Sequence, residues 1–152
     1  MYIRDIMKRN VTTCRLDNSA EDVALMMWNN DCGSIPVVDD SGKALGMITD
    51  RDICMATALQ KKPAYDIRVA DIMSRHLFSC QSDNDVKHAM KTMANHRVKR
   101  LPITNGSGQV EGILSIDDII ASAERGARGI TSPELSFDDA VITMKSVCNH
   151  HQ

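Results

Sequence analysis

The stretch GMITDRDI, residues 46–53, recurs as GILSIDDI at residues 112–119, and this duplication decides how the chain is organised. Each copy contains a glycine, then a hydroxyl side chain three residues later, then an aspartate three residues after that. These positions are Gly46, Thr49 and Asp52 in the first copy, and Gly112, Ser115 and Asp118 in the second. The apolar residues before the hydroxyl predict a strand, and the residues after it predict a helix.

The duplication extends far beyond these eight residues. Shifting the sequence by 66 positions aligns 5–57 with 71–123 without a gap, which indicates a tandem repeat. We therefore predict a first repeat at 1–60, a linker at 61–67, a second repeat at 68–125, and a connection with a C-terminal helix and tail at 126–152.

Each repeat has the same predicted order of elements. A short helical turn, at 3–7 or 69–73, leads into a brief strand around VTTC (11–14) or LFSC (77–80). A helix capped by Ser19 or Asp85 follows, then a hairpin over 34–49 or 101–115, and then a last helix. The fold class is therefore α/β (α+β), with two β-α-β-β-α repeats whose small sheets can cover each other. Ser136 is expected to cap a further helix that carries Ala140, Val141, Met144 and Val147.

Composition excludes several classes of protein. The 152 residues are 43% hydrophobic, which is enough for a core, and the formal net charge is −2. There is thus no global basic surface for nucleic acid, and no apolar run approaches the roughly 18 residues that a membrane span needs. The N-terminal residues lack the apolar region of a signal peptide. We expect a soluble cytoplasmic protein.

The cysteines predict neither a disulfide framework nor a metal centre. Their number is odd and none forms a C-x-x-C pair, so reduced and mostly buried thiols are expected at Cys14, Cys32, Cys54, Cys80 and Cys148. Cys148, His150 and His151 are three donors in a terminal tail without a fourth at a zinc-site spacing. We expect no metal site and no catalytic residue.

The hydroxyl and aspartate of each copy have two interpretations. Three residues apart at the start of a helix, Thr49 and Asp52 could face one spot where a hydroxyl and free N–H groups attract phosphate. The carboxylate could accept hydrogen bonds from two vicinal alcohols, so that a ribose 5′-phosphate would match both groups. Alternatively, Thr49 or Ser115 caps the helix and Asp52 or Asp118 lies in its first turn.

Cations near these segments differ between the repeats. The second repeat carries His96, Arg97, Lys99 and Arg100 in NHRVKRLPI, whereas the first carries Asp31, Cys32, Gly33 and Ser34 in the matching segment NNDCGSIPV. With Arg51, these cations could collect in a cleft between the repeats and bind an anion. The alternative is a solvated basic turn.

The doubled pattern of DIM, a helix, IPVVD or LPIT, and then G-x-x-[TS]-x-x-D resembles the cystathionine-β-synthase (CBS) domain, and the tandem resembles a CBS pair, or Bateman module, over residues 2–124. The resemblance implies repeats packed through their sheets with pseudo-two-fold symmetry, and flat homodimers. It also implies that AMP, ADP or ATP binds the clefts between repeats, with NAD or S-adenosylmethionine as alternatives. Asp52 and Asp118 would hold ribose hydroxyls, and Thr49 and Ser115 would help bind phosphate. The base would lie against Val11, Thr12, Thr13, Ile35 and Pro36, or against Leu77, Phe78, Ser79, Leu101 and Pro102.

We therefore expect a stand-alone regulatory module without catalysis, whose output passes to a protein partner through the C-terminal helix. One rival is a dimerisation scaffold that binds no ligand. Another is a redox or metal enzyme, which would require a grouped nucleophile, base and orienting residue that the spacing does not supply.

Overall fold

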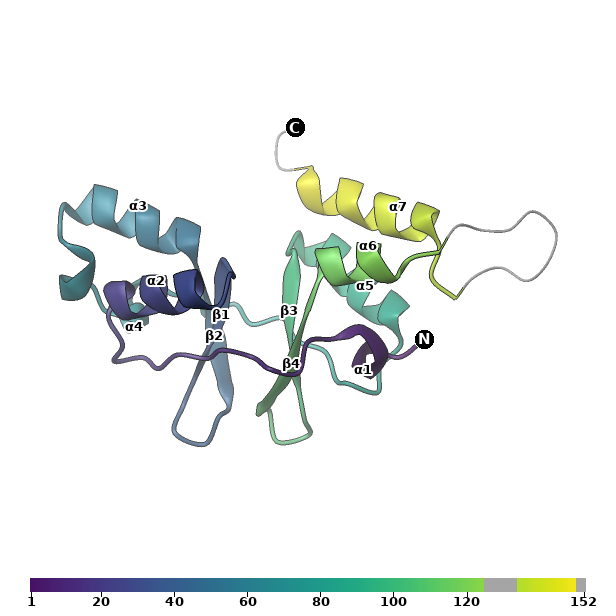
Figure 1. The fold of residues 1–152 in the computed structure, drawn as a ribbon, viewed down its shortest axis with the longest axis horizontal. Coiled ribbons are helices and arrows are strands. Elements are labelled where there is room, and N and C mark those ends of the chain that lie inside the picture. The colour runs from purple at the N-terminus through teal and green to yellow at the C-terminus, as the bar shows by residue number, and fades with distance from the viewer. Residues whose placement is uncertain (125–133, 150–152) are drawn as a thin grey trace. The chain divides into compact units, whose positions relative to one another are not determined.

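The computed structural model describes residues 1–124 and 134–149. Most of the connection expected from 126 onward therefore lies outside the described residues. The helices and strands are α1 (Ile3–Ile6), α2 (Ala20–Asn29), β1 (Ser34–Val38), β2 (Ala44–Thr49), α3 (Asp50–Gln60), α4 (Val69–Ile72), α5 (Val86–His96), β3 (Arg100–Thr104), β4 (Val110–Ser115), α6 (Ile116–Ser122) and α7 (Phe137–Cys148) (Figure 1). A short 3-10 helix, Ala64–Asp66, precedes α4.

The chain forms two compact units. The first-repeat unit comprises Asn10–Leu77 and Gly106–Val110, and the second-repeat unit comprises Met1–Arg9, Phe78–Asn105 and Glu111–Gln152. Each contains one antiparallel hairpin, β1–β2 or β3–β4. The expected mixed α/β class is thus confirmed, while the division at 1–60, 61–67 and 68–125 stays a prediction about the sequence repeat.

Each repeat exchanges its opening helix with the other unit. In the second-repeat unit, the N–H of Ile3 in α1 donates to the Asn84 carbonyl at 2.9 Å. In the first-repeat unit, the N–H of Val69 in α4 donates to the Asn18 carbonyl, also at 2.9 Å. Ile3 and Val69 are repeat equivalents, as are Asn18 and Asn84, so one local contact is made twice with the segments swapped.

The first-repeat unit has its own apolar core. Helix α2 begins at a capping box in which Ser19 accepts from the Asp22 N–H at 3.1 Å. Val23 and Met27, one turn apart, are buried, as the helical spacing predicts. The core is completed by Cys14, Ala20, Ile35, Val37, Ile48, Ile53, Ala56, Ile67, Val69 and Met73.

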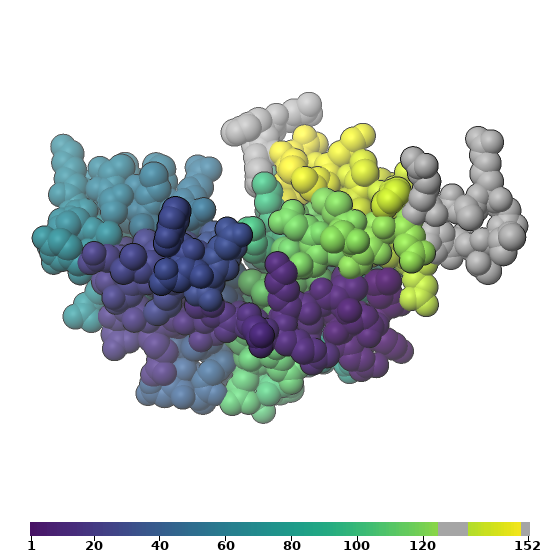
Figure 2. Space-filling view, viewed as in Figure 1, coloured from purple at the N-terminus to yellow at the C-terminus, as the bar shows by residue number. Residues whose placement is uncertain are grey.

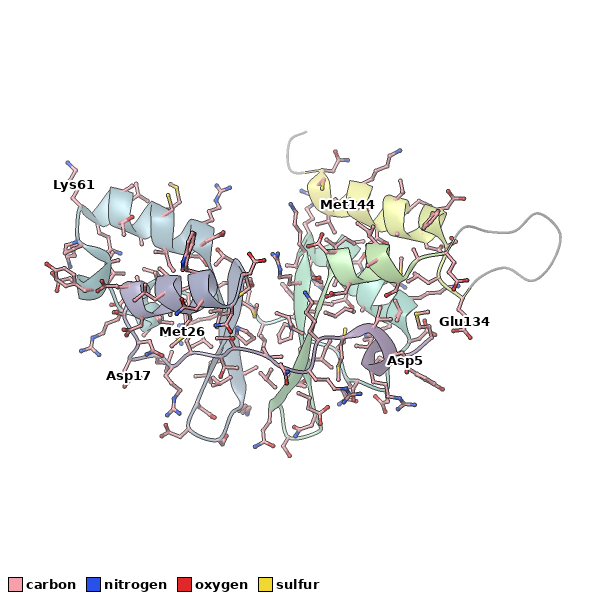
Figure 3. All side chains as sticks on the ribbon, viewed as in Figure 1. Asp5, Asp17, Met26, Lys61, Glu134 and Met144 are labelled. Atoms are coloured by element: carbon pink, nitrogen blue, oxygen red, sulfur yellow. The ribbon has the colours of Figure 1, made fainter. Side chains whose placement is uncertain are left out.

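The second-repeat unit is larger because α7 packs on α5 and α6 (Figures 1 and 2). Ala140, Thr143 and Val147 form the buried stripe of α7, at intervals of three and four residues. Val141 and Met144, also expected on the apolar face, remain exposed, and Met144 is labelled on α7 in Figure 3. They lie about one residue's rotation, roughly 100°, away from the buried stripe.

The brief strands expected around VTTC and LFSC are each reduced to one bridge. Cys14 makes an isolated parallel bridge with Val37, and Cys80 makes one with Ile103. Neither segment continues into a ladder.

No helix within the described ranges combines the length and apolarity needed to cross a bilayer.

Candidate functional site

The two G-x-x-[TS]-x-x-D segments begin helices α3 and α6 through the same capping box. Thr49 Oγ1 accepts from the Asp52 N–H at 3.1 Å, and Asp52 Oδ2 accepts from the Thr49 N–H at 2.9 Å. Ser115 and Asp118 form the same pair of bonds at 3.2 and 2.8 Å, and the Ser115 hydroxyl also donates to Asp118 Oδ2 at 2.5 Å. The capping interpretation is therefore confirmed. In both boxes the reciprocal backbone bonds use Oδ2 and leave Oδ1 of the carboxylate outside the box.

A capping box alone does not identify a ligand site in this chain. Ser19 with Asp22, and Ser136 with Asp139, form boxes of the same kind at the starts of α2 and α7. In these two the hydrogen bonds lower the carboxyl pKa: the Ser19 N–H is the main cause at Asp22, and the Ser136 hydroxyl at Asp139. The glycine three residues before the cap sets the other two boxes apart.

These glycines allow a neighbouring segment to pass close to the strand. A Cβ built on Gly46 would lie 2.1 Å from the Ser74 carbonyl oxygen. One built on Gly112 would lie 2.7 Å from Met7 Sδ and 2.9 Å from the Lys8 carbonyl oxygen. The exchanged segments thus explain why both copies carry glycine at this position.

Within each unit, a backbone hydrogen bond joins the ends of the predicted base-binding segments. In the first-repeat unit, the Cys14 N–H donates to the Pro36 carbonyl at 3.1 Å, so the half-buried segment Val11–Thr13 leads directly to the strand that carries buried Ile35 and Pro36. In the second-repeat unit, the Cys80 N–H donates to the Pro102 carbonyl at 3.3 Å, which places Phe78 and Ser79 beside Leu101 and Pro102. Leu77 is the exception, because it belongs to the first-repeat unit.

The predicted cations Lys99, Arg100 and Arg51 are exposed or half-buried near the starts of β3, α6 and α3. The Lys99 carbonyl accepts from the Ile116 N–H at 2.9 Å, so Lys99 adjoins the start of α6, and Arg100 begins β3 half-buried. Arg51 is exposed in the first turn of α3. Its N–H donates to Asp50 Oδ1 at 2.8 Å.

Two contacts in the second-repeat unit were not predicted. Lys8 Nζ lies 3.6 Å from Asp118 Oδ1, the oxygen left outside the capping box. The Phe78 ring stacks on the His96 ring, with centroids 3.8 Å apart. The repeat pattern carries no signal for the lysine, because it arrives on the exchanged N-terminal segment.

An apolar groove of about 400 Å³ on α6 and α7 is lined by Ile120, Phe137, Ala140, Val141, Met144, Lys145 and Cys148. Figure 2 shows α7 in yellow at the surface of this unit.

No three His, Cys, Asp or Glu side chains converge as metal ligands in residues 1–124 and 134–149. His150 and His151 of the CNHH tail lie outside those ranges. Cys14 and Cys80, at equivalent repeat positions, are buried, and burial raises the pKa of Cys14 to about 12 and also raises that of Cys80.

We expect the cysteines to differ sharply in reactivity. Because the thiolate is the reactive form, Cys14 and Cys80 should resist a thiol reagent at pH 8 until the chain unfolds, whereas exposed Cys54 and Cys148 should react in the folded protein. Timed alkylation followed by peptide mass spectrometry measures each rate. Labelling of Cys14 as fast as Cys54 in the folded protein would contradict this burial.

Comparison with known protein families identifies the same two repeats. The family model of the CBS domain matches residues 3–58 and 69–125. The chain therefore belongs to the CBS-domain family and contains two such domains, as the resemblance implied.

The similar proteins include both uncharacterised and structurally determined relatives. The CBS domain-containing protein YhcV of Bacillus subtilis is 32% identical over 117 residues, covering 77% of this chain and 81% of that protein. The uncharacterised protein MK0525 of Methanopyrus kandleri is 29% identical over 118 residues, covering 78% of this chain but only 60% of that protein. The crystal structure of the CBS domain pair of protein MJ0100, in complex with 5′-methylthioadenosine and S-adenosyl-L-methionine, matches with a TM-score of 0.73 and 26% identity, covering 80% of this chain and 94% of that one.

Proposed function

We propose that this chain is a regulatory module that binds adenine nucleotides, with one binding segment per unit. Asp52 and Asp118 accept hydrogen bonds from the ribose hydroxyls, and Thr49 and Ser115 contribute to phosphate binding. The observation that carries the proposal is that these two matched boxes, unlike those at Ser19 and Ser136, each follow a glycine that lets an exchanged segment pass close to the strand. The adenosine-containing ligands of the MJ0100 domain pair support the same ligand class.

The adenine base is proposed to lie between the strand that contains Pro36 or Pro102 and the segment joined to it by a backbone bridge. In the first-repeat unit this is Val11–Thr13 with Ile35 and Pro36. In the second-repeat unit it is Phe78 and Ser79 with Leu101 and Pro102, where the aromatic side chain of Phe78 offers a stacking surface. Lys99, Arg100 and Arg51 are proposed to contact phosphate.

The module is proposed to act without catalysis. AMP, ADP or ATP are the favoured ligands, with NAD or S-adenosylmethionine as alternatives. A ligand with different affinities for two arrangements of repeats or subunits shifts their equilibrium, typically by about 1–3 kcal/mol. We propose a cytoplasmic location and assign the output to the apolar groove on α6 and α7, where a protein partner could dock.

We include a homodimer in the proposal, because the first-repeat unit exposes large apolar side chains on α2 and α3. Trp28 is 85% exposed, and Leu25, Met55 and Leu59 accompany it. Exposed apolar patches often mark interaction surfaces. The same observation favours the second candidate, a dimerisation scaffold without a ligand.

A ligand series separates the two candidates. The melting temperature should rise with at least one of AMP, ATP, NAD and S-adenosylmethionine, since a ligand at 100 times its dissociation constant adds about 2.7 kcal/mol to the folded state. Guanosine monophosphate serves as the matched control and should have little effect. A dimer by light scattering whose melting temperature ignores all four adenine ligands would instead support the scaffold.

A further inference from the structure

Lys8 and Ser74 occupy structurally equivalent positions, 66 residues apart, beside equivalent strands. Lys8 forms an antiparallel bridge with Ile113 in β4, with both N–H···O bonds at 2.9 Å. Ser74 forms the same bridge with Met47 in β2, with bonds of 3.0 and 2.9 Å. The two segments can therefore be compared residue by residue.

The equivalent positions carry different chemistry. The Lys8 side chain is 69% exposed, and its ammonium lies 3.6 Å from Oδ1 of Asp118, whose side chain is only 12% exposed. The lysine thus contacts the one carboxylate oxygen that the capping box leaves to a ligand. Ser74 brings no charge to Asp52.

Two further pairs of positions near the boxes are structurally equivalent but differ in charge. Arg97 and Asp31 both adopt left-handed backbone at the matching position after their helices, with φ of 54° and 49°. Lys99 and Gly33 are also equivalent, because their carbonyls accept from the first helical N–H of α6 and α3 at 2.9 and 3.0 Å.

The remaining equivalent positions complete the contrast. At the positions compared, the second-repeat unit has four cations and one anion, namely Lys8, Arg97, Lys99, Arg100 and Asp117, of which Lys8 contacts Asp118. The matching positions of the first-repeat unit, together with Asp50 at the position of Ile116, hold one cation and two anions, namely Arg51, Asp31 and Asp50. The Asp50 carboxylate lies over Gly33, with Oδ2 2.8 Å from the point where a Cβ would stand.

Resting on the proposed function, we propose that the two sites select adenosine ligands by the charge of the 5′ substituent. The site in the second-repeat unit takes a ligand with an anionic phosphate, and Lys8 is the residue that determines this specificity. The site in the first-repeat unit, where Arg51 is outnumbered by Asp31 and Asp50, binds phosphate less well and prefers a ligand whose 5′ substituent is neutral or cationic.

The ion pair explains the selectivity physically. Ribose hydroxyls that bind Asp118 Oδ1 compete with the Lys8 ammonium for this oxygen. A phosphate gives the exposed and flexible lysine a new anionic partner, whereas a neutral ligand must compete with the ammonium and offers it nothing in return. In the first-repeat unit the charges of Asp50 and Asp31 outweigh the single charge of Arg51, so a phosphate is disfavoured relative to a neutral or cationic group.

Titration calorimetry of single-site variants tests the proposal with AMP and 5′-methylthioadenosine. In an Asp52→Ala background, which leaves the second-repeat site, Lys8→Met should weaken AMP binding about tenfold, the loss of one charged contact. It should also strengthen methylthioadenosine binding. Lys91→Met, which removes an exposed cation of α5, is the matched control and should change neither affinity.

The repeat supplies the reverse experiment. In an Asp118→Ala background, Ser74→Lys should raise the affinity of the first-repeat site for AMP relative to methylthioadenosine. Equal effects of Lys8→Met on both ligands, or none, would overturn the proposal while adenosine binding itself stands. Absence of binding of either ligand to the wild-type chain would instead overturn the proposed function, and this proposal with it.

Discussion

Gly46→Ala is expected to lower the free energy of unfolding by about 3 kcal/mol or more, at or above the upper end of the usual cost of overpacking. Its new Cβ would lie 2.1 Å from the Ser74 carbonyl oxygen, which belongs to backbone held by two hydrogen bonds to Met47. A backbone atom cannot rotate away as a side chain can. In a chain of this length the loss corresponds to a fall in melting temperature of roughly 10 °C, which differential scanning calorimetry measures.

Gly106→Ala is the control for Gly46→Ala. A Cβ at Gly106 meets nothing within 4 Å, so its melting temperature should stay close to the wild-type value. Gly112→Ala should fall between the two, because the Met7 thioether can move and the backbone contact there, 2.9 Å to the Lys8 carbonyl oxygen, is less severe than 2.1 Å at Gly46. If Gly46→Ala and Gly106→Ala melt together, the exchanged segment at Ser74 does not pass β2 as described.

The second large effect is expected on ligand affinity. Asp52→Ala with Asp118→Ala should weaken AMP binding by at least about 100-fold, because each site loses two hydrogen bonds to a charged acceptor, worth about 1.5–3 kcal/mol each. Titration calorimetry at matched salt concentration measures the change.

The chain contains its own control for the loss of a helix cap. Asp22→Ala with Asp139→Ala removes the aspartates of two capping boxes of the same kind, each with a cost of the order of 1 kcal/mol in stability. This variant should melt earlier but retain its affinity for AMP. If both double variants lost the same affinity for AMP, Asp52 and Asp118 would affect binding only through the stability of the fold.

Features encoded within a few residues could be predicted from the sequence. The boxes at Ser19, Ser115 and Ser136 depend on side chains three residues apart, and the hairpins depend on short polar turns between apolar runs. Both are local, so their patterns lie in one window of sequence. The repeat then applies each local prediction twice.

Features that join distant segments could not be predicted. An alignment of the repeats is identical whether α1 and α4 stay with their own repeat or exchange, and only the packing distinguishes these arrangements. The contact of Lys8 with Asp118 depends on that exchange, so it was missed. Likewise, helical periodicity placed Val141 and Met144 on the same apolar face as Ala140, but only tertiary contacts show which stripe of α7 is buried.

Calorimetric titration of AMP against 2′,3′-dideoxyadenosine monophosphate tests most directly whether the aspartates at 52 and 118 hold ribose hydroxyls. The two ligands share base and phosphate and differ only in the alcohols. We predict that the wild-type chain binds AMP at least about 100-fold more tightly, and that the double alanine variant at these positions loses the preference. Equal affinity of the wild-type chain for both ligands would contradict the assignment.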